Sequence, residues 1–133
     1  MTIARRDFLK QSSILATGSL LLNTSIAQTI SNNISKVKIG LIGVGLRGQN
    51  HLDALLRRTD VEVTAIADPD LNMISKAINA FEKVGASKPI VFSNGNYDYK
   101  NLLKSNDVDA VIISTPWEWH AEQTIDAVNA QKI

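Results

Sequence analysis

The glycine-rich segment GVGLRG, residues 43–48, has the residue types and spacing needed to hold a phosphate group. It follows a short apolar run, residues 37–42, and precedes a helical pattern. Gly43 suits a tight turn, Gly45 has no side chain to keep a pyrophosphate at a distance, and Gly48 permits close packing of helix on strand. The helix N-terminus would present N–H groups and partial positive charge to the phosphates.

An aspartate completes this pattern. The apolar run Val61–Ala67 predicts a second strand, and Asp68 follows it, 25 residues after Gly43. A carboxylate there can accept both ribose hydroxyls of an adenosine, and its charge would repel the 2′-phosphate of NADP. Strand, loop, helix and acid together predict NAD binding. The alternative is a glycine-rich turn beside a surface aspartate. Arg47, in the loop, could contact phosphate or, as a second option, a 2′-phosphate.

The segment TPWEWH, residues 115–120, holds both tryptophans of the chain, and it follows the apolar run DAVIIS. Trp117 and Trp119 could form flat apolar walls for the nicotinamide–ribose half of the cofactor or for a sugar face. Glu118 and His120 can hydrogen-bond hydroxyl groups.

These side chains also have simpler alternative roles. The indoles could belong to the core of a domain interface. Glu118 could complement the dipole of the following helix, and His120 could cap that helix.

Strand and helix patterns alternate along residues 37–130. Strands are predicted at residues 37–42, 61–67, 89–92 and 109–114, and helices from the glycine loop to about residue 58 and over 71–84, 99–104 and 120–130. Asp70 and Asp98 are candidate caps for the second and third helices. The alternation predicts an α/β fold, a Rossmann-type doubly wound parallel sheet with helices on both faces. In such a sheet strand 4 returns beside strand 1, so the glycine loop and TPWEWH should face each other across the ligand crevice.

The first 27 residues have the pattern of a twin-arginine export signal. Arg5 and Arg6 precede a mild apolar stretch, and Ser25-Ile26-Ala27 has the small-x-small spacing of a cleavage site. The alternative is a basic amphipathic helix. We expect a signal over 1–27, a polar lead-in over 28–36, a nucleotide-binding domain over 37–133, and export to the periplasm or medium through the twin-arginine machinery.

Composition narrows the function classes. The chain has 133 residues, is 44% hydrophobic and 20% charged, lacks cysteine and carries a formal net charge of +1. These values suit a globular domain and exclude disulfide or thiolate chemistry. The near-neutral charge argues against a nucleic-acid partner. No apolar run is long enough to span a bilayer. We predict no metal site.

Three segments resemble glycoside hydrolase family 109, within the Gfo/Idh/MocA oxidoreductases. They are GLIGVGLRGQNHLDALLRRTDVEVTAIADPD, FSNGNYDYKNLL and STPWEWH. The resemblance covers essentially the whole chain. It implies cofactor contacts from the Leu-Arg of the glycine loop, the acid after strand 2 and the Trp-Glu-Trp-His segment, which here are Leu46, Arg47, Asp68, Trp117, Glu118, Trp119 and His120.

The resemblance also implies an activity. Members oxidise carbon 3 of an N-acetylgalactosaminide with NAD⁺, eliminate the glycosidic oxygen after loss of the carbon 2 proton, add water and return the hydride. Family members continue beyond QKI with a fifth strand and a substrate domain, so we expect this chain to be a fragment. We expect the catalytic residues and the sugar contacts in the missing domain, and no activity from the fragment alone. Two alternatives stay open, an exported sugar oxidoreductase of the same superfamily and a non-catalytic nucleotide-binding module.

Overall fold

A computed structural model of the chain describes residues 35–132. The predicted signal over 1–27 and most of the lead-in over 28–36 lie outside the described residues. The predicted nucleotide-binding domain begins where the first strand does, at Val37.

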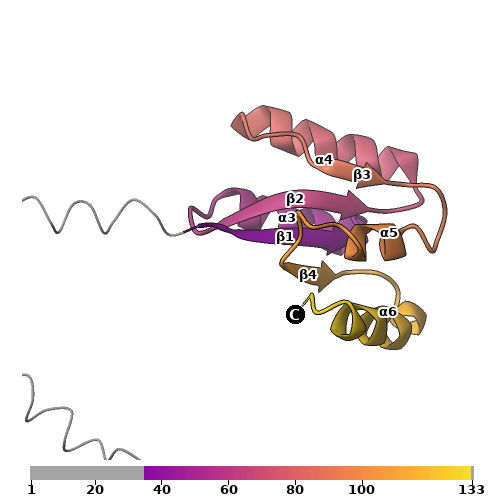
Figure 1. The fold of residues 1–133 in the computed structure, drawn as a ribbon. Coiled ribbons are helices and arrows are strands. Elements are labelled where there is room, and N and C mark those ends of the chain that lie inside the picture. Colours follow the sequence, from indigo (N-terminus) through magenta and orange to yellow (C-terminus); the bar gives the residue numbers. More distant parts are fainter. Residues whose placement is uncertain (1–34, 133) are drawn as a thin grey trace, which may run out of the picture. The chain divides into compact units, whose positions relative to one another are not determined.

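Four parallel strands form one sheet (Figure 1). They are β1 (Val37–Ile42), β2 (Val61–Ala67), β3 (Ile90–Phe92) and β4 (Ala110–Ile113). The order is β3-β2-β1-β4, which confirms the predicted return of strand 4 beside strand 1.

The register aligns the carboxyl ends of the strands. Ile42 pairs with Ala67 on β2 and with Ile113 on β4. Consequently Gly43, Asp68 and Ser114, each the first residue after its strand, emerge at the same edge of the sheet. Backbone hydrogen bonds extend the ladder to these residues, from Gly43 N–H to the Ala67 carbonyl and from Ser114 N–H to the Ile42 carbonyl, both at 2.8 Å.

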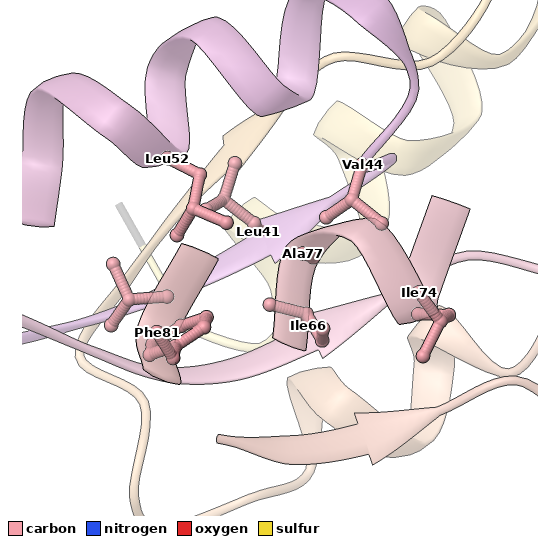
Figure 2. Close-up of a cluster of buried hydrophobic side chains, with 8 residues drawn as sticks. Leu41, Val44, Leu52, Ile66, Ile74, Ala77 and Phe81 are labelled. Carbon is pink, nitrogen blue, oxygen red and sulfur yellow. The ribbon is translucent and has the colours of Figure 1, made fainter. Parts of the chain in front are cut away.

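Helices cover both faces of the sheet. Successive strand residues point to opposite faces, so Leu41 and Ile42 belong to different cores. Leu41 packs with α3 (Leu46–Leu56) and α4 (Leu71–Val84), in the cluster drawn in Figure 2: Leu41, Val44, Leu52, Val63, Ile66, Ile74, Ala77 and Phe81. Ile42 packs with α5 (Tyr99–Leu103) and α6 (Trp117–Asn129), in a second cluster: Ile42, Ala65, Ala67, Tyr99, Leu102, Leu103, Val108 and Ala127.

One of the two predicted caps forms. The Asp70 carboxylate accepts the N–H of Asn72 at 2.8 Å and that of Met73 at 3.4 Å, at the start of α4. Asp98 precedes α5 but does not cap it with its side chain, so this prediction is wrong. Its backbone is already helical (φ −67°, ψ −16°), which turns the carboxylate away from the first helical N–H groups.

The last helix begins earlier than predicted. The sequence pattern placed its start at His120, whereas α6 begins at Trp117, directly after Pro116. Proline has a fixed φ and suits a helix start. Trp117 and Trp119 therefore lie in the first helical turn. Residues two apart on a helix point about 200° away from each other, so the two indoles must face different surroundings.

Within the described part of the chain, no helix combines the length and apolar character needed to cross a membrane.

Candidate functional site

The glycine loop packs tightly against the backbone around it. Gly43 has φ +87°, a left-handed conformation that favours glycine, and a Cβ on it would lie 2.9 Å from the Ser114 carbonyl carbon. A Cβ on Gly48 would lie 2.2 Å from the Gly43 carbonyl oxygen. The predicted roles of Gly43 in the turn and of Gly48 in close packing are therefore confirmed. Together they bring α3 close to the loop, and the loop close to Ser114 and Thr115, which follow β4.

Gly45 is different from these two glycines. Its φ of −65° is open to any residue, and a Cβ on it would meet no atom within 4 Å. Neither conformation nor packing requires glycine here. The absent side chain instead leaves space in front of the N-terminus of α3, whose first N–H groups have no partner within the helix. A phosphate group fits this space and these donors.

Asp68 ties the glycine loop to the next helix. Its Oδ2 accepts the Val44 N–H at 2.8 Å, and its Oδ1 accepts the Asp70 N–H at 2.9 Å. Each oxygen retains acceptor capacity, because a carboxylate has about four lone-pair sites. Asp68 is half-buried and can still accept hydroxyl groups from a ligand. The sequence pattern did not reveal that it also shapes the loop.

A cavity of about 330 Å³ opens at this edge of the sheet. We call it the Asp68 cleft. Its lining has apolar walls and no lysine, arginine or histidine, and consists of Ile42, Gly43, Gly45, Ala67, Asp68, Pro69, Gly95, Asn96, Tyr99, Ser114, Thr115, Pro116, Trp119 and Gln123.

Two aromatic side chains, Tyr99 of α5 and Trp119 of α6, line the cleft, and Tyr97 lies in the turn before α5. Tyr97 packs edge-on against Trp119, with ring centroids 5.3 Å apart. The buried Tyr99 donates its hydroxyl to the Asp126 carboxylate at 2.7 Å. Burial, and then this carboxylate, raise the pKa of Tyr99 well above its ordinary value, so the phenol stays protonated. Sequence reasoning missed Tyr97 and Tyr99, although their position in NYDY, after the third strand, was the available signal.

Asp98 sets the turn that carries these tyrosines. Its buried carboxylate accepts the Asn94 N–H at 2.8 Å and the Asn101 Nδ2–H at 2.7 Å. The Asn94 N–H, followed by Asn101, lowers the pKa of Asp98 below its ordinary value. The rim of the cleft at Gly95 and Asn96 is therefore folded around an ionised carboxylate.

A second hollow, of about 470 Å³, lies where α3 and α6 begin. We call it the Arg47 recess. Its lining contains three residues that can carry positive charge, and consists of Arg47, His51, Ile113, Ser114, Thr115, Trp117 and His120. Ser114 and Thr115 also line the Asp68 cleft.

Polar groups of the recess are mostly exposed. Arg47 makes no ion pair with any residue between 35 and 132. His120 Nε2 lies 2.7 Å from the Thr115 carbonyl oxygen. Because a carbonyl can only accept, Nε2 carries the hydrogen, and Nδ1 of the neutral ring is left as an acceptor.

The predicted site residues thus separate into two groups. Gly43, Gly45, Asp68 and Trp119 line the Asp68 cleft, whereas Arg47, Trp117 and His120 line the Arg47 recess. Gly48 is buried behind the loop. Leu46, 86% exposed, and Glu118, in the first turn of α6, line neither hollow. The two tryptophans, predicted to act on the same half of the ligand, lie on different sides.

Among residues 35–132, no group of three or more histidine, cysteine, aspartate or glutamate side chains is placed to hold a metal ion.

Comparison with known proteins agrees with this geometry. Residues 37–133 match the Gfo/Idh/MocA family, described as an oxidoreductase family with an NAD-binding Rossmann fold. A glycosyl hydrolase family 109 protein of Shewanella woodyi is 37% identical over 81% of this chain. An α-N-acetylgalactosaminidase of Shewanella oneidensis is 34% identical over 98% of it. This chain spans 23% of the first relative and 32% of the second.

Solved structures share the fold. A scyllo-inositol dehydrogenase of Lactobacillus casei, solved with NAD(H) and scyllo-inositol, superposes with a TM-score of 0.61 at 24% identity, covering 74% of this chain and 26% of that one. A 3-ketoreductase of Actinomadura kijaniata, in complex with NADP and TDP-benzene, gives 0.59 at 29% identity, covering 74% of this chain and 27% of that one. The chain belongs to the Gfo/Idh/MocA oxidoreductase family, and its residues 37–133 correspond to that family's NAD-binding Rossmann fold.

Proposed function

We propose that this domain binds NAD across the Asp68 cleft and the Arg47 recess. The adenosine half lies in the Asp68 cleft, the diphosphate lies over the N-terminus of α3, and the nicotinamide half extends toward the Arg47 recess. The observation that carries the proposal is the open space at Gly45, which neither the backbone conformation nor the packing explains. A diphosphate in that space accepts the first N–H groups of α3 and lies near the Arg47 guanidinium.

Asp68 makes NAD the preferred dinucleotide. Its carboxylate accepts the ribose hydroxyls, while the 2′-phosphate of NADP would bring negative charge against it. The cleft offers no basic side chain among its lining residues to offset that repulsion. Arg47 lines the other hollow, which argues against its use for a 2′-phosphate.

Calorimetry on the 133-residue chain tests this proposal. We expect saturable NAD binding that is tighter than NADP binding. Equal affinities, or no binding of either dinucleotide, would contradict it.

We further propose that the protein acts as an α-N-acetylgalactosaminidase of glycoside hydrolase family 109. The named relatives, 37% and 34% identical to this chain, support this activity. A bound NAD would supply hydride transfer from and back to a sugar carbon. The roles of this chain's own residues are then to hold and orient the cofactor.

Each hollow supplies a different part of that orientation. Asp68 fixes the ribose, the N-terminus of α3 and Arg47 hold the diphosphate, and His120 Nδ1 can accept a hydrogen bond from the nicotinamide half. Glu118 lines neither hollow, so we assign it no acid role in glycoside cleavage.

A labelling experiment tests the activity. The protein expressed from its complete coding sequence is given an α-linked N-acetylgalactosaminide in deuterated water. Oxidation followed by elimination places deuterium at carbon 2 of the released sugar, whereas direct displacement at the anomeric carbon leaves that position protonated. Proton NMR of the product distinguishes the two.

The second candidate is a sugar oxidoreductase of the same family. The inositol dehydrogenase and 3-ketoreductase neighbours favour it at the level of the fold. Accumulation of NADH with intact glycoside, in the same experiment, would select this candidate over the glycosidase.

For localisation we propose twin-arginine export, supported by Arg5, Arg6 and the small-x-small pattern ending at Ala27. Replacing both arginines with lysine should retain the protein in the cytoplasm. Unchanged export in cell fractionation would contradict this proposal.

A further inference from the structure

Gln123 is an unusual residue for the floor of a nucleotide cleft. It lies in the second turn of α6 and is only 2% exposed, and it lines the Asp68 cleft. Asp98 is the other buried polar or charged residue of the described chain, and each of its carboxylate oxygens accepts a hydrogen bond within the turn that it shapes.

The hydrogen bonds of Gln123 are only half complete. Its Oε1 accepts the Thr115 hydroxyl at 2.5 Å, whereas its Nε2 bonds to no residue from 35 to 132. Among residues 35–132, Ser114 Oγ is the one fully enclosed side-chain polar atom that lacks a hydrogen-bond partner. Gln123 Nε2 also lacks a partner in this range, so it is not fully enclosed and remains accessible from the cleft. An amide nitrogen carries two N–H donors, and leaving them unsatisfied is costly. Water in the open cleft can accept from these donors, and a ligand that displaces this water must offer an acceptor in its place.

The surroundings of Gln123 indicate what kind of acceptor fits. No basic side chain lines the cleft, so nothing near Gln123 attracts a phosphate group, and the N–H groups proposed to hold the diphosphate lie at Gly45. Its walls near α6 are flat and apolar, formed by Tyr99, Pro116 and Trp119. A planar, neutral group that carries acceptor atoms matches them, and a nucleobase is such a group.

The positions of Asp68 and Gln123 relative to the sheet also favour a nucleobase near Gln123. Asp68 follows β2 and Gln123 lies on the helix after β4, with β1 between the two strands. Two strand spacings separate these elements by roughly 10 Å. A ribose at Asp68 can thus place its base toward α6, away from the diphosphate at Gly45.

We propose that Gln123 reads the base of the dinucleotide, with Nε2 donating a hydrogen bond to a ring nitrogen of adenine. This assignment rests on the proposed NAD site. Thr115 is the positioning residue, because its hydroxyl holds Oε1 and so directs Nε2 into the cleft.

The test compares AMP with ribose 5-phosphate, which has the same sugar and phosphate but no base. Both are titrated into the ¹⁵N-labelled chain, and into Gln123→Met, which removes both donors at similar volume. Thr115→Val tests the positioning role, because it breaks the Thr115–Gln123 bond while both N–H donors of Gln123 remain.

We expect Gln123→Met to weaken AMP binding about tenfold, which corresponds to about 1.4 kcal/mol, and to leave ribose 5-phosphate binding unchanged. Thr115→Val should lose part of the preference for AMP, and less of it than Gln123→Met, because Nε2 remains but is no longer held by the Thr115 hydroxyl. In the wild-type chain, the Gln123 side-chain amide signals should shift with AMP and not with ribose 5-phosphate. This last readout needs no variant to fold.

Three results would overturn the assignment. If AMP shifts the NMR signal of the Val44 amide, which contacts Asp68, while the Gln123 side-chain signals stay fixed, the nucleotide site is supported and the proposed role of Gln123 is wrong. If AMP shifts neither the Val44 signal nor the Gln123 signals, both the nucleotide site and the role of Gln123 are wrong. Equal losses for AMP and ribose 5-phosphate in both variants would reduce Gln123 to a structural residue.

Discussion

The Asp68 cleft and the Arg47 recess share Ser114 and Thr115 but satisfy their polar groups differently. In the cleft, Asp68 already accepts two backbone N–H groups, and Thr115 holds one end of the Gln123 amide. In the recess, Arg47 has no ion-pair partner among the described residues. A preorganised cleft with apolar walls and one carboxylate suits the adenosine half of a dinucleotide, whereas an exposed cation suits the charged diphosphate.

The strongest expected effect concerns the glycines between the two hollows. Gly48→Ala places a methyl group 2.2 Å from the Gly43 carbonyl oxygen, so the backbone must shift. We expect a loss of about 3 kcal/mol in the free energy of unfolding. Urea denaturation measures it.

Gly45→Ala is the matched control, because its Cβ meets no atom within 4 Å. Its stability should change by less than about 0.5 kcal/mol, while NAD affinity falls about tenfold because the methyl group enters the phosphate space. Equal stability of the two variants would contradict the claim that close packing requires glycine at position 48. Unchanged NAD affinity in Gly45→Ala would contradict the placement of the diphosphate at Gly45.

Asp68→Ala comes next in expected size. It removes a charged acceptor and leaves the Val44 N–H without its partner, so NAD binding should weaken by about 1.5–3 kcal/mol, and discrimination against NADP should fall. Asp68→Asn keeps one oxygen acceptor without the charge. Its NAD affinity should be intermediate, with the same tolerance of NADP. Calorimetry with both dinucleotides checks this, and NAD affinity equal to wild type in both variants would exclude Asp68 from the site.

Arg47→Ala should have a smaller effect, confined to the recess. The side chain is exposed and makes no ion pair with other described residues, so stability should not change. Loss of an exposed charge near the diphosphate should weaken NAD binding by about 1 kcal/mol, or about fivefold, and this loss should shrink at high salt. An effect that does not depend on salt would argue against direct charge attraction.

The smallest effect concerns acid stability of the cleft rim. The pKa of Asp98 is lowered in the folded chain, so its stabilisation is complete above the unfolded pKa of about 3.9 and is lost as the pH falls through the lower folded pKa. Asp98→Asn should therefore show a shallower loss of unfolding free energy between about pH 5 and 3 than the wild type. Parallel urea titrations across that range check it, and identical slopes would contradict it.

Strand order and the glycine loop could be predicted from the sequence, because buried strands, glycines and an acid at a strand end each leave a local pattern. The first turn of α6 could not, because Pro116 followed by two tryptophans has no strong helical periodicity. Gln123 was missed for a different reason. Its burial depends on how α6 packs on the sheet, which no local pattern specifies.

The sequence also did not predict that the two tryptophans line different hollows. This separation allows the most direct test of whether the two halves of NAD lie in different hollows. Single-tryptophan variants report on one hollow each, with Trp119 remaining in Trp117→Phe and Trp117 remaining in Trp119→Phe. Tryptophan fluorescence is measured during titration with AMP and then with NAD. AMP should change the emission of Trp119 alone, and NAD should change both. A response of Trp117 to AMP, or of neither tryptophan to NAD, would contradict the placement of adenosine in the Asp68 cleft and of the nicotinamide half toward the Arg47 recess.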